Sequence, residues 1–430
     1  MTRDKTFAKT LLAAVITGCA ALATVPAATA AAPAARIIPN QYIVVLDRAA
    51  LPKSLARLGV KDLVDSTLVQ VGGGVVLARY QTALLGFSAR LTANQAEALA
   101  KLPYVKSVEA DQVMSAVATQ SNATWGLDRI DQRNLPMDGL YIYRDQAGAG
   151  VNVYIVDTGL NAAHTEFTGR TKPGQNFAPN SDGLIGGLLP IGGLVPINIG
   201  ALDLGTGLFS GNTDPNDTTD CNGHGTHVAG TAVGTVYGVA KKANVIPVRV
   251  LGCSGSGSNA GVIAGVDWVA SQTARPAVAN MSLGGGDSPA LDQAVTSAIN
   301  RGISFAVAAG NDSSGACSGS PYKVPNAITV GSTDQGDNMS SFSNFGACID
   351  IFAPGGSITS ASSTSNTGTA VLSGTSMASP HVAGAVALIL GANPAFAPST
   401  VSGALRTNAT PNKVTAIGAN TPNFLLFTPQ

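Results

Sequence analysis

The stretch VNVYIVDTG (151–159) begins with a nearly continuous apolar run that ends at Asp157. Its apolar residues do not alternate with polar ones, as they would in a strand with one face in water. Three further stretches have the same character: NVIPVRVL (244–251), VANMSL (278–283) and ISFAVAAG (303–310). Helical patterns follow at LDQAVTSAINRG (291–302) and SPHVAGAVALIL (379–390). This alternation predicts an α/β fold, a doubly wound and mostly parallel sheet with helices on both faces.

The composition excludes several classes of partner. The chain has 430 residues, only 12% of them charged, and a formal net charge of zero. Because there is no basic excess, we expect no nucleic-acid partner. Because no apolar run of about 18 residues follows the N-terminal region, we expect no membrane span. The length allows one large domain and a smaller one.

The N-terminus has the pattern of an export signal. Three basic residues precede the apolar stretch 10–25, and Ala28-Thr29-Ala30 matches the A-x-A cleavage pattern. We therefore expect a signal peptide at 1–30 and a secreted protein. The alternative is a lipid anchor on Cys19, because ITGC (16–19) resembles a bacterial lipobox.

Three motifs each carry one residue of hydrolytic chemistry. Asp157 ends the first strand, His224 begins a helix in NGHGTHVAGT (222–231), and Ser376 lies on the small-residue turn of GTSMASPHVAG (374–384). A serine hydroxyl attacks a carbonyl only if a base removes its proton, and a carboxylate can orient that base. We predict that Asp157, His224 and Ser376 form this triad. Their order along the chain is that of subtilisin.

The three motifs resemble those of the subtilisin-like serine proteases. Over residues 118–428 the chain is similar to the branch of that family that contains proteinase K and aqualysin I. The segment AAGND (308–312) resembles the family's oxyanion segment, which implies that the Asn311 amide and the Ser376 N–H stabilise the oxyanion. The resemblance implies a secreted endopeptidase that acts on proteins and peptides through an acyl-enzyme. We expect it to be a monomer.

Competing motifs fit less well. An esterase elbow, G-x-S-x-G, would need glycine at Ala378, and an aspartic protease would need a second D-[TS]-G besides the one at 157–159. HExxH of zinc proteases is absent, so His227 is expected to be structural. Two other function classes stay open, a non-proteolytic serine hydrolase such as an esterase and a catalytically idle surface-binding protein.

Small residues near these motifs are predicted to contact the substrate. We expect the peptide to add as a β-strand between GSGS (255–258) and SLGG (282–285), since glycine lets two backbones approach closely. No acidic residue in these segments suits a basic side chain, so we expect broad specificity that favours apolar and aromatic P1 residues. The predicted contacts are Gly255, Ser256, Gly257, Ser282, Leu283, Gly284, Ala308, Ala309 and Gly310.

Residues 31–117 are expected to form a separate domain. QYIVVL (41–46), GFSARL (86–91) and VKSVEAD (105–111) are predicted strands, and NQAEALAKL (94–102) is a predicted helix. The pattern resembles the inhibitory propeptides of subtilisin-like proteases, which are small α+β domains of ferredoxin-like fold. This implies an inactive precursor that is inhibited by its own propeptide. It would cleave itself near Val117–Ala118 to leave a catalytic domain at 118–430. The alternative is a permanent accessory domain.

Four cysteines lie outside the signal segment. In an exported protein an even number predicts disulfides, with three pairings possible; free thiols or a zinc site are the alternatives. The resemblance implies the pairs Cys221–Cys253 and Cys317–Cys348.

The resemblance also implies structural Ca²⁺ and no cofactor for catalysis. One calcium site would use the carbonyls of Pro325 and Ala327 with the carboxylate of Asp350. A second site would use Asp128, Asp131, Gln132 and Asp138.

One segment departs from the family. An insertion at about 178–213 is rich in Gly, Leu and Ile and carries few charges. A surface loop is the favoured interpretation, and an apolar flap over the cleft is the alternative. After it, Asp214, Asp217 and Asp220 are expected to lie in a solvated loop.

Overall fold

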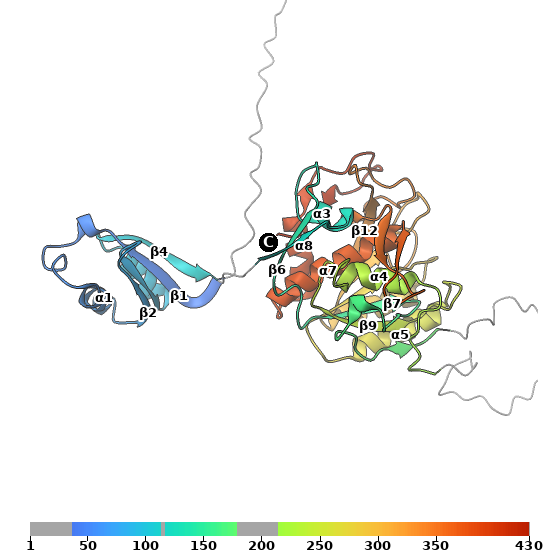
Figure 1. Cartoon of the computed structure of the whole chain (residues 1–430), viewed down its shortest axis with the longest axis horizontal. Helices are drawn as coiled ribbons and strands as arrows, with labels where there is room; N and C mark the ends of the chain where they lie inside the picture. Colours follow the sequence, from blue (N-terminus) through green and yellow to red (C-terminus); the bar gives the residue numbers. More distant parts are fainter. Residues whose placement is uncertain (1–36, 113–116, 179–213, 430) are drawn as a thin grey trace, which may run out of the picture. The chain divides into compact units, whose positions relative to one another are not determined.

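The computed structural model describes residues 37–112, 117–178 and 214–429, in two compact units. The units are Met1–Val113 and Met114–Gln430, so the division lies close to the predicted boundary after Val117. The expected signal peptide, with Cys19, and nearly all of the insertion lie outside the described residues. Figure 1 shows the two units, which are described separately below.

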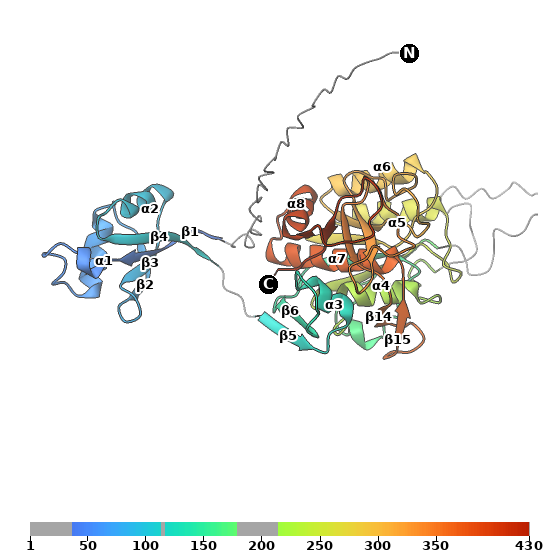
Figure 2. The same ribbon diagram turned by 90° about the horizontal axis from the view of Figure 1, so that it is seen from above.

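The first unit is a four-stranded antiparallel sheet with two helices. The strand order β2-β3-β1-β4 is that of the ferredoxin-like fold, as expected. Both helices share one hydrophobic core with the sheet, built on Val44, Phe87 and Leu99 (Figure 2). Thr92 and Gln95 form a capping box that begins the second helix. The elements are β1 (Ile37–Leu46), α1 (Val60–Val69), β2 (Val75–Tyr80), β3 (Gly86–Arg90), α2 (Ala93–Ala100) and β4 (Val105–Gln112), with a 3-10 turn at Arg48–Ala50.

The second unit contains a nine-stranded sheet within the described residues. Its order is β16-β17-β13-β12-β11-β10-β7-β9-β8, and every pair is parallel except β16 with β17. The fold class predicted from the sequence is therefore correct. The strands are β7 (Asn152–Asp157), β8 (Gln175–Asn176), β9 (Asn244–Arg249), β10 (Ala277–Met281), β11 (Ser304–Ala308), β12 (Ile328–Thr333), β13 (Ile351–Pro354), β16 (Thr410–Pro411) and β17 (Phe424–Leu425).

Helices cover both faces of this sheet. Along β7, Val153 and Ile155 belong to the core shared with α4 (His224–Val233) and α7 (Thr375–Ala392). Their neighbours Tyr154 and Val156 belong to the core shared with α5 (Asn259–Ser271) and α6 (Pro289–Asn300). Burial of both faces explains why the strand sequences lack polar alternation.

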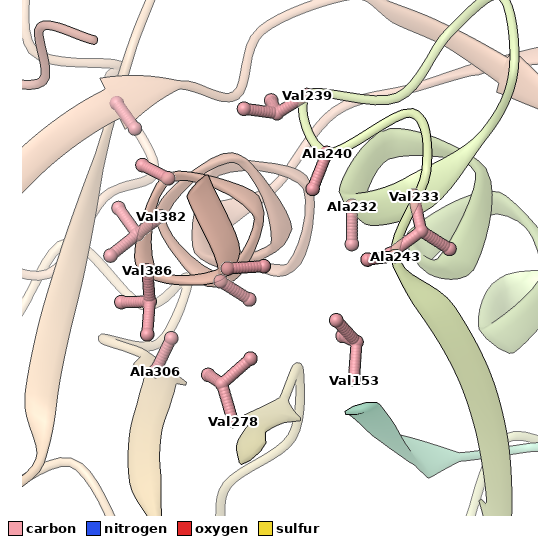
Figure 3. Packing of buried hydrophobic residues seen from close by; sticks show 14 of the residues in the cluster. Val153, Ala232, Val233, Val239, Ala240, Ala243, Val278, Ala306, Val382 and Val386 are labelled. Atoms are coloured by element: carbon pink, nitrogen blue, oxygen red, sulfur yellow. The ribbon is translucent and has the colours of Figure 1, made fainter. Parts of the chain in front are cut away.

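Small side chains let α4 and α7 pack closely against the sheet. In Figure 3, Val386 of α7 lies next to Ala306 of β11, and Ala232 of α4 lies on the other side of α7, near Ala240 and Ala243. Among the described residues α7 is the one helix long and apolar enough to cross a membrane, but most of it is buried in this core.

The remaining elements surround this core. The hairpin β14 (Ile358–Ala361) and β15 (Thr369–Leu372) packs on α4 through β14. The others are β5 (Val117–Ser121), α3 (Trp125–Ile130), β6 (Leu140–Arg144), the 3-10 turn Thr165–Phe167 and α8 (Pro398–Asn408).

Two disulfides join loops at the surface of the second unit. Cys221 pairs with Cys253 and Cys317 with Cys348, with Cα–Cα distances of 5.0 and 5.4 Å. These are the pairs that the resemblance implies. The first disulfide ties the segment before α4 to the segment after β9, and both segments border the site described below.

Two histidines, one on α4 and one on α7, are buried and neutral. His227 is fully buried with Nε2 2.9 Å from the carbonyl of Ile358, and His381 is 1% exposed with Nδ1 2.9 Å from the carbonyl of Met377. Burial lowers the pKa of each imidazole to about 4. His227 is thus structural, as expected.

These histidines should make the fold sensitive to acid. In the unfolded chain each takes up a proton near pH 6.5, whereas in the folded chain it stays neutral down to about pH 4. Their contribution to the free energy of unfolding is therefore present above pH 6.5. It is lost as the pH falls, by up to about 1.4 kcal/mol per pH unit for each histidine. Urea unfolding of His227→Gln and His381→Gln, measured between those pH values in a Ser376→Ala background that prevents self-digestion, should show shallower slopes than the parent. Parallel curves would contradict neutral burial.

Candidate active site

A buried carboxylate and an imidazole meet at the carboxyl end of β7. Asp157 is fully buried, and its Oδ1 lies 2.7 Å from Nδ1 of His224, the first residue of α4. The N–H of Thr158 also donates to this oxygen, at 2.7 Å. With its Nδ1–H directed to the carboxylate, the imidazole presents Nε2 as a proton acceptor.

The charge of Asp157 changes the basicity of His224. Burial alone would lower the pKa of the imidazole. The negative charge of Asp157, the hydrogen bond to it and the more distant Asp220 outweigh burial, and the pKa rises above its usual 6.5. His224 is thus a stronger base than a free histidine.

Asp220 organises the turn that leads into α4. Its carboxylate accepts hydrogen bonds from the N–H groups of Gly223 and Thr226, both at 2.8 Å, and from the hydroxyl of Thr158 at 2.8 Å. The Thr158 hydroxyl in turn accepts the N–H of Gly225 at 2.9 Å. Burial would raise the pKa of Asp220, but a hydrogen bond from the Thr226 hydroxyl, together with the bonds above, outweighs burial and lowers the pKa. The expectation of a solvated loop is wrong for Asp220, which is 5% exposed.

The third predicted residue, Ser376, lies in the first turn of α7 and is joined to Ser282. The Ser376 hydroxyl donates to the Ser282 carbonyl at 3.2 Å, and the Ser282 hydroxyl donates to the Ser376 carbonyl at 2.7 Å. Ser282 follows the carboxyl end of β10 and lines the same cleft as His224 and Thr158. Ser376 itself is not among the residues that line this cleft, and it adjoins the cleft through its two hydrogen bonds with Ser282.

The cleft has a volume of about 400 Å³ and a lining without carboxylates among the described residues. Both predicted substrate segments, 255–258 and 282–285, form part of its wall, and Asn259 extends the first of them. Gly255 has φ of +78°, a conformation that favours glycine. Ala308, Ala309 and Gly310 are not part of this described lining; the two alanines are buried at the end of β11. The remaining wall residues are Leu251, Val262 and Leu291, besides Asn222, His224 and Thr158.

The amide of Asn311 is oriented by its neighbour Thr375. Its Oδ1 accepts hydrogen bonds from the N–H and the hydroxyl of Thr375, at 2.8 and 2.9 Å, which leaves Nδ2 directed elsewhere. A Cβ built on Gly374 would lie 3.4 Å from Nδ2 of Asn311 and 3.5 Å from the N atom of Ser376. Two N–H donors thus flank one small space beside Gly374. That arrangement suits an oxyanion.

Asn344 holds the turn that carries Asn311, and no sequence signal identified it. Its Nδ2 donates to the Ala309 carbonyl at 2.9 Å, and its Oδ1 accepts the N–H groups of Asp312 and Ser314, each at 3.0 Å. The hydrogen bonds of Asn344 therefore hold the main chain on both sides of Asn311. Asn344 is 1% exposed and distant in sequence, so only the fold places it here.

One of the predicted calcium ligands is the partly buried carboxylate of Asp350. Desolvation raises the pKa of Asp350 to about 6, although Oδ2 accepts the N–H of Thr329 at 2.8 Å and the charge of Arg406 acts in the opposite direction. A partly buried carboxylate of this kind is suited to an oxygen-coordinated metal. Ala327 is buried and Pro325 exposed, on the loop before β12.

The predicted second calcium set is less well assembled. The carboxylate of Asp128 accepts the N–H groups of Asp138 and Gly139, at 3.2 and 2.7 Å. Burial, followed by the negative charges of Asp128 and Asp138, raises the pKa of Asp131 to about 7. The amide of Gln132 donates to main-chain carbonyls. In the part of the chain that the structure describes, no three His, Cys, Asp or Glu side chains are grouped to hold a metal.

Comparisons with known proteins match both units of the chain. A profile of the subtilase family matches residues 148–424, and one of the peptidase inhibitor I9 family matches residues 41–116. An extracellular serine proteinase of Thermus sp. (strain Rt41A) is 47% identical over 407 residues, covering 91% of this chain and 90% of the relative. Alkaline serine exoprotease A of Vibrio alginolyticus is 43% identical over 403 residues, covering 91% and 68%. The crystal structure of a cold adapted subtilisin-like serine proteinase is 48% identical and aligns with a TM-score of 0.62, over 72% of this chain and all of that one.

A methyl group at Gly374 should block the space between the two donors. The backbone at Gly374 is extended, with φ of 161°, so alanine fits the main chain and acts only through its Cβ. We expect Gly374→Ala to lower kcat by about 10²–10³-fold, the magnitude known for the loss of one oxyanion donor in subtilisin. KM for a short peptide should change little. Gly403→Ala, on α8 and with open space around the added Cβ, is the control. Equal kcat values for Gly374→Ala and the control would contradict the assignment.

Proposed function

The chain belongs to the subtilase family of serine endopeptidases, and from that premise we propose that Asp157, His224 and Ser376 are its catalytic residues. The protein is secreted. The observation that carries the proposal is the 2.7 Å contact of Asp157 with Nδ1 of His224, beside the cleft that Ser376 reaches through Ser282. Family membership favours an endopeptidase over the esterase and the idle binding protein.

The reaction begins with a rotation of the Ser376 hydroxyl. After the rotation the hydroxyl donates its hydrogen bond to Nε2 of His224 instead of the Ser282 carbonyl. Oγ then attacks the scissile carbonyl as the hydroxyl proton passes to the imidazole. The buried charge of Asp157 stabilises the imidazolium that forms. His224 then gives the proton to the leaving amine, and an acyl-enzyme on Ser376 remains. Water, deprotonated by the same histidine, hydrolyses this ester.

Negative charge on the carbonyl oxygen is stabilised by fixed donors. We assign this role to Nδ2 of Asn311 and the N–H of Ser376, which flank the space beside Gly374. Thr375 and Asn344 orient Asn311 before the substrate arrives. Preorganised donors of this kind need no rearrangement as charge develops.

The substrate is proposed to bind as a strand between segments 255–258 and 282–285. The cleft between them has an uncharged wall of glycine, serine and aliphatic side chains. Such a wall offers no counter-charge to lysine or arginine, which supports broad specificity that favours apolar and aromatic P1 residues. Ala308–Gly310 would complete the S1 pocket next to Asn311.

The precursor is proposed to consist of three segments. They are a signal peptide at 1–30, an inhibitory propeptide at 31–117 and a catalytic domain at 118–430. The I9 match at 41–116 and the ferredoxin-like fold of the first unit support the second segment. Structural Ca²⁺ is proposed at Asp350 with the carbonyls of Pro325 and Ala327, where it would neutralise a partly buried carboxylate. The set around Asp131 is a weaker candidate.

Self-processing provides the test of this proposal. Wild-type precursor should appear as a mature chain that begins near Ala118, whereas Ser376→Ala precursor should stay full length when expressed and purified in the same way. Intact mass and N-terminal sequencing distinguish the two products. If both chains stay full length, or both are trimmed at the same bond, the proposal is wrong.

A further inference from the structure

The helix that carries the proposed nucleophile contains a proline one turn after it. Pro380 lies inside α7, four residues beyond Ser376. In an α-helix the N–H of residue i donates to the carbonyl of residue i−4, and proline has no N–H. The Ser376 carbonyl therefore has no helical donor at position 380, where any residue other than proline would supply one.

The side chain of Ser282, which follows β10 directly, supplies the missing hydrogen bond. The Ser282 hydroxyl donates to the Ser376 carbonyl at 2.7 Å, and Ser282 is 3% exposed. The same residue accepts the Ser376 hydroxyl on its main-chain carbonyl. Ser282 thus contacts both the backbone and the reactive group of the serine.

The Ser282 hydroxyl is held in place by a buried chain of hydrogen bonds. Nδ2 of Asn280 donates to it at 2.9 Å, and Oδ1 of Asn280 accepts the Ser379 hydroxyl at 2.8 Å. Asn280 and Ser379 are both fully buried. The chain starts on α7 at Ser379, passes through β10 and returns to α7 at Ser376. Because the Asn280 amide donates to Ser282, the hydroxyl hydrogen of Ser282 is directed at the Ser376 carbonyl.

We propose that Ser282 is a positioning residue whose hydroxyl replaces the helix hydrogen bond that Pro380 cannot make. This rests on the proposed role of Ser376 as nucleophile. The residue that is held, Ser376, also carries the N–H proposed to bind the oxyanion and the side chain proposed to attack. Small displacements of such groups cost rate rather than substrate affinity. The role belongs to the side chain of Ser282 and is separate from the contact of its segment with substrate.

A cycle of three variants in the full-length precursor tests the proposal. Ser282→Ala removes the donor, Pro380→Ala restores a helix N–H to the Ser376 carbonyl, and the third variant combines both. Active sites are titrated, and kcat and KM are measured with a short chromogenic peptide. Ser282→Ala should lower kcat about tenfold, equivalent to ~1.4 kcal/mol, with little change in KM. Pro380→Ala should rescue most of this loss in the double variant.

Ser360→Ala is the matched control. The Ser360 hydroxyl is also buried and also donates to a helix carbonyl, that of His227 at 2.8 Å. Four residues beyond His227 is Thr231, which keeps its N–H, so no helix bond is missing there. This variant should unfold at a lower temperature but keep its kcat per active site.

Each outcome supports or overturns the proposal. Equal kcat for Ser282→Ala and Ser360→Ala, or a Ser282→Ala defect that Pro380→Ala leaves intact, would overturn it. If Ser282→Ala yields no mature enzyme, recovery of mature enzyme in the double variant supports the proposal and failure of recovery overturns it. Peptidase activity retained by Ser376→Ala would instead refute the proposed function.

Discussion

The hydrogen bond between Asp157 and His224 depends on the strand order of the sheet. β7 lies between β9 and β10 in the sheet. The strands before β10 are added on one side of β7 and the later strands on the other, so the winding direction of the chain reverses next to β7. In open α/β sheets the carboxyl ends of the strands surround a crevice at such a point. Asp157, Ser282 and Asn311 all lie at or just beyond carboxyl ends of neighbouring strands. A carboxylate buried there needs a hydrogen-bonded partner, and the imidazole provides one.

The site is held by polar side chains that bond to the protein's own main chain and to one another. Asp220 and Thr158 fix the start of α4, Asn344 and Thr375 fix Asn311, and Asn280 with Ser282 fixes the start of α7. All of them except Asn280, which bonds to the side chains of Ser282 and Ser379, satisfy main-chain groups where a helix or strand ends. These groups would otherwise be left without partners, since regular secondary structure does not continue there. The same bonds that stabilise the ends of the elements therefore hold the reactive groups.

The sequence predicted the parts of the molecule that depend on local pattern or on long motifs. The apolar strands at 151–157 and 278–283, the helix after Ser376 and the segments that form the cleft all follow from such signals. It missed α1, where polar and apolar residues are equally numerous, and β2, where Val75 and Leu77 are exposed, and it missed Asn344. It also placed Asp220 in solvent, because its burial depends on the folding of the turn before α4 against Thr158, which is 62 residues away in the sequence. Pairwise contacts of this kind have no local periodicity to reveal them.

Covalent labelling of the nucleophile, measured against pH, tests the convergence of the three residues most directly. A serine-directed phosphonylating reagent should label Ser376 and no other serine, as shown by peptide mapping. Its rate should follow one ionisation whose midpoint lies above pH 6.5, because Asp157 raises the pKa of His224. Asp157→Asn should slow the labelling strongly. Label on another residue, or a labelling rate unaffected by Asp157→Asn, would contradict the account.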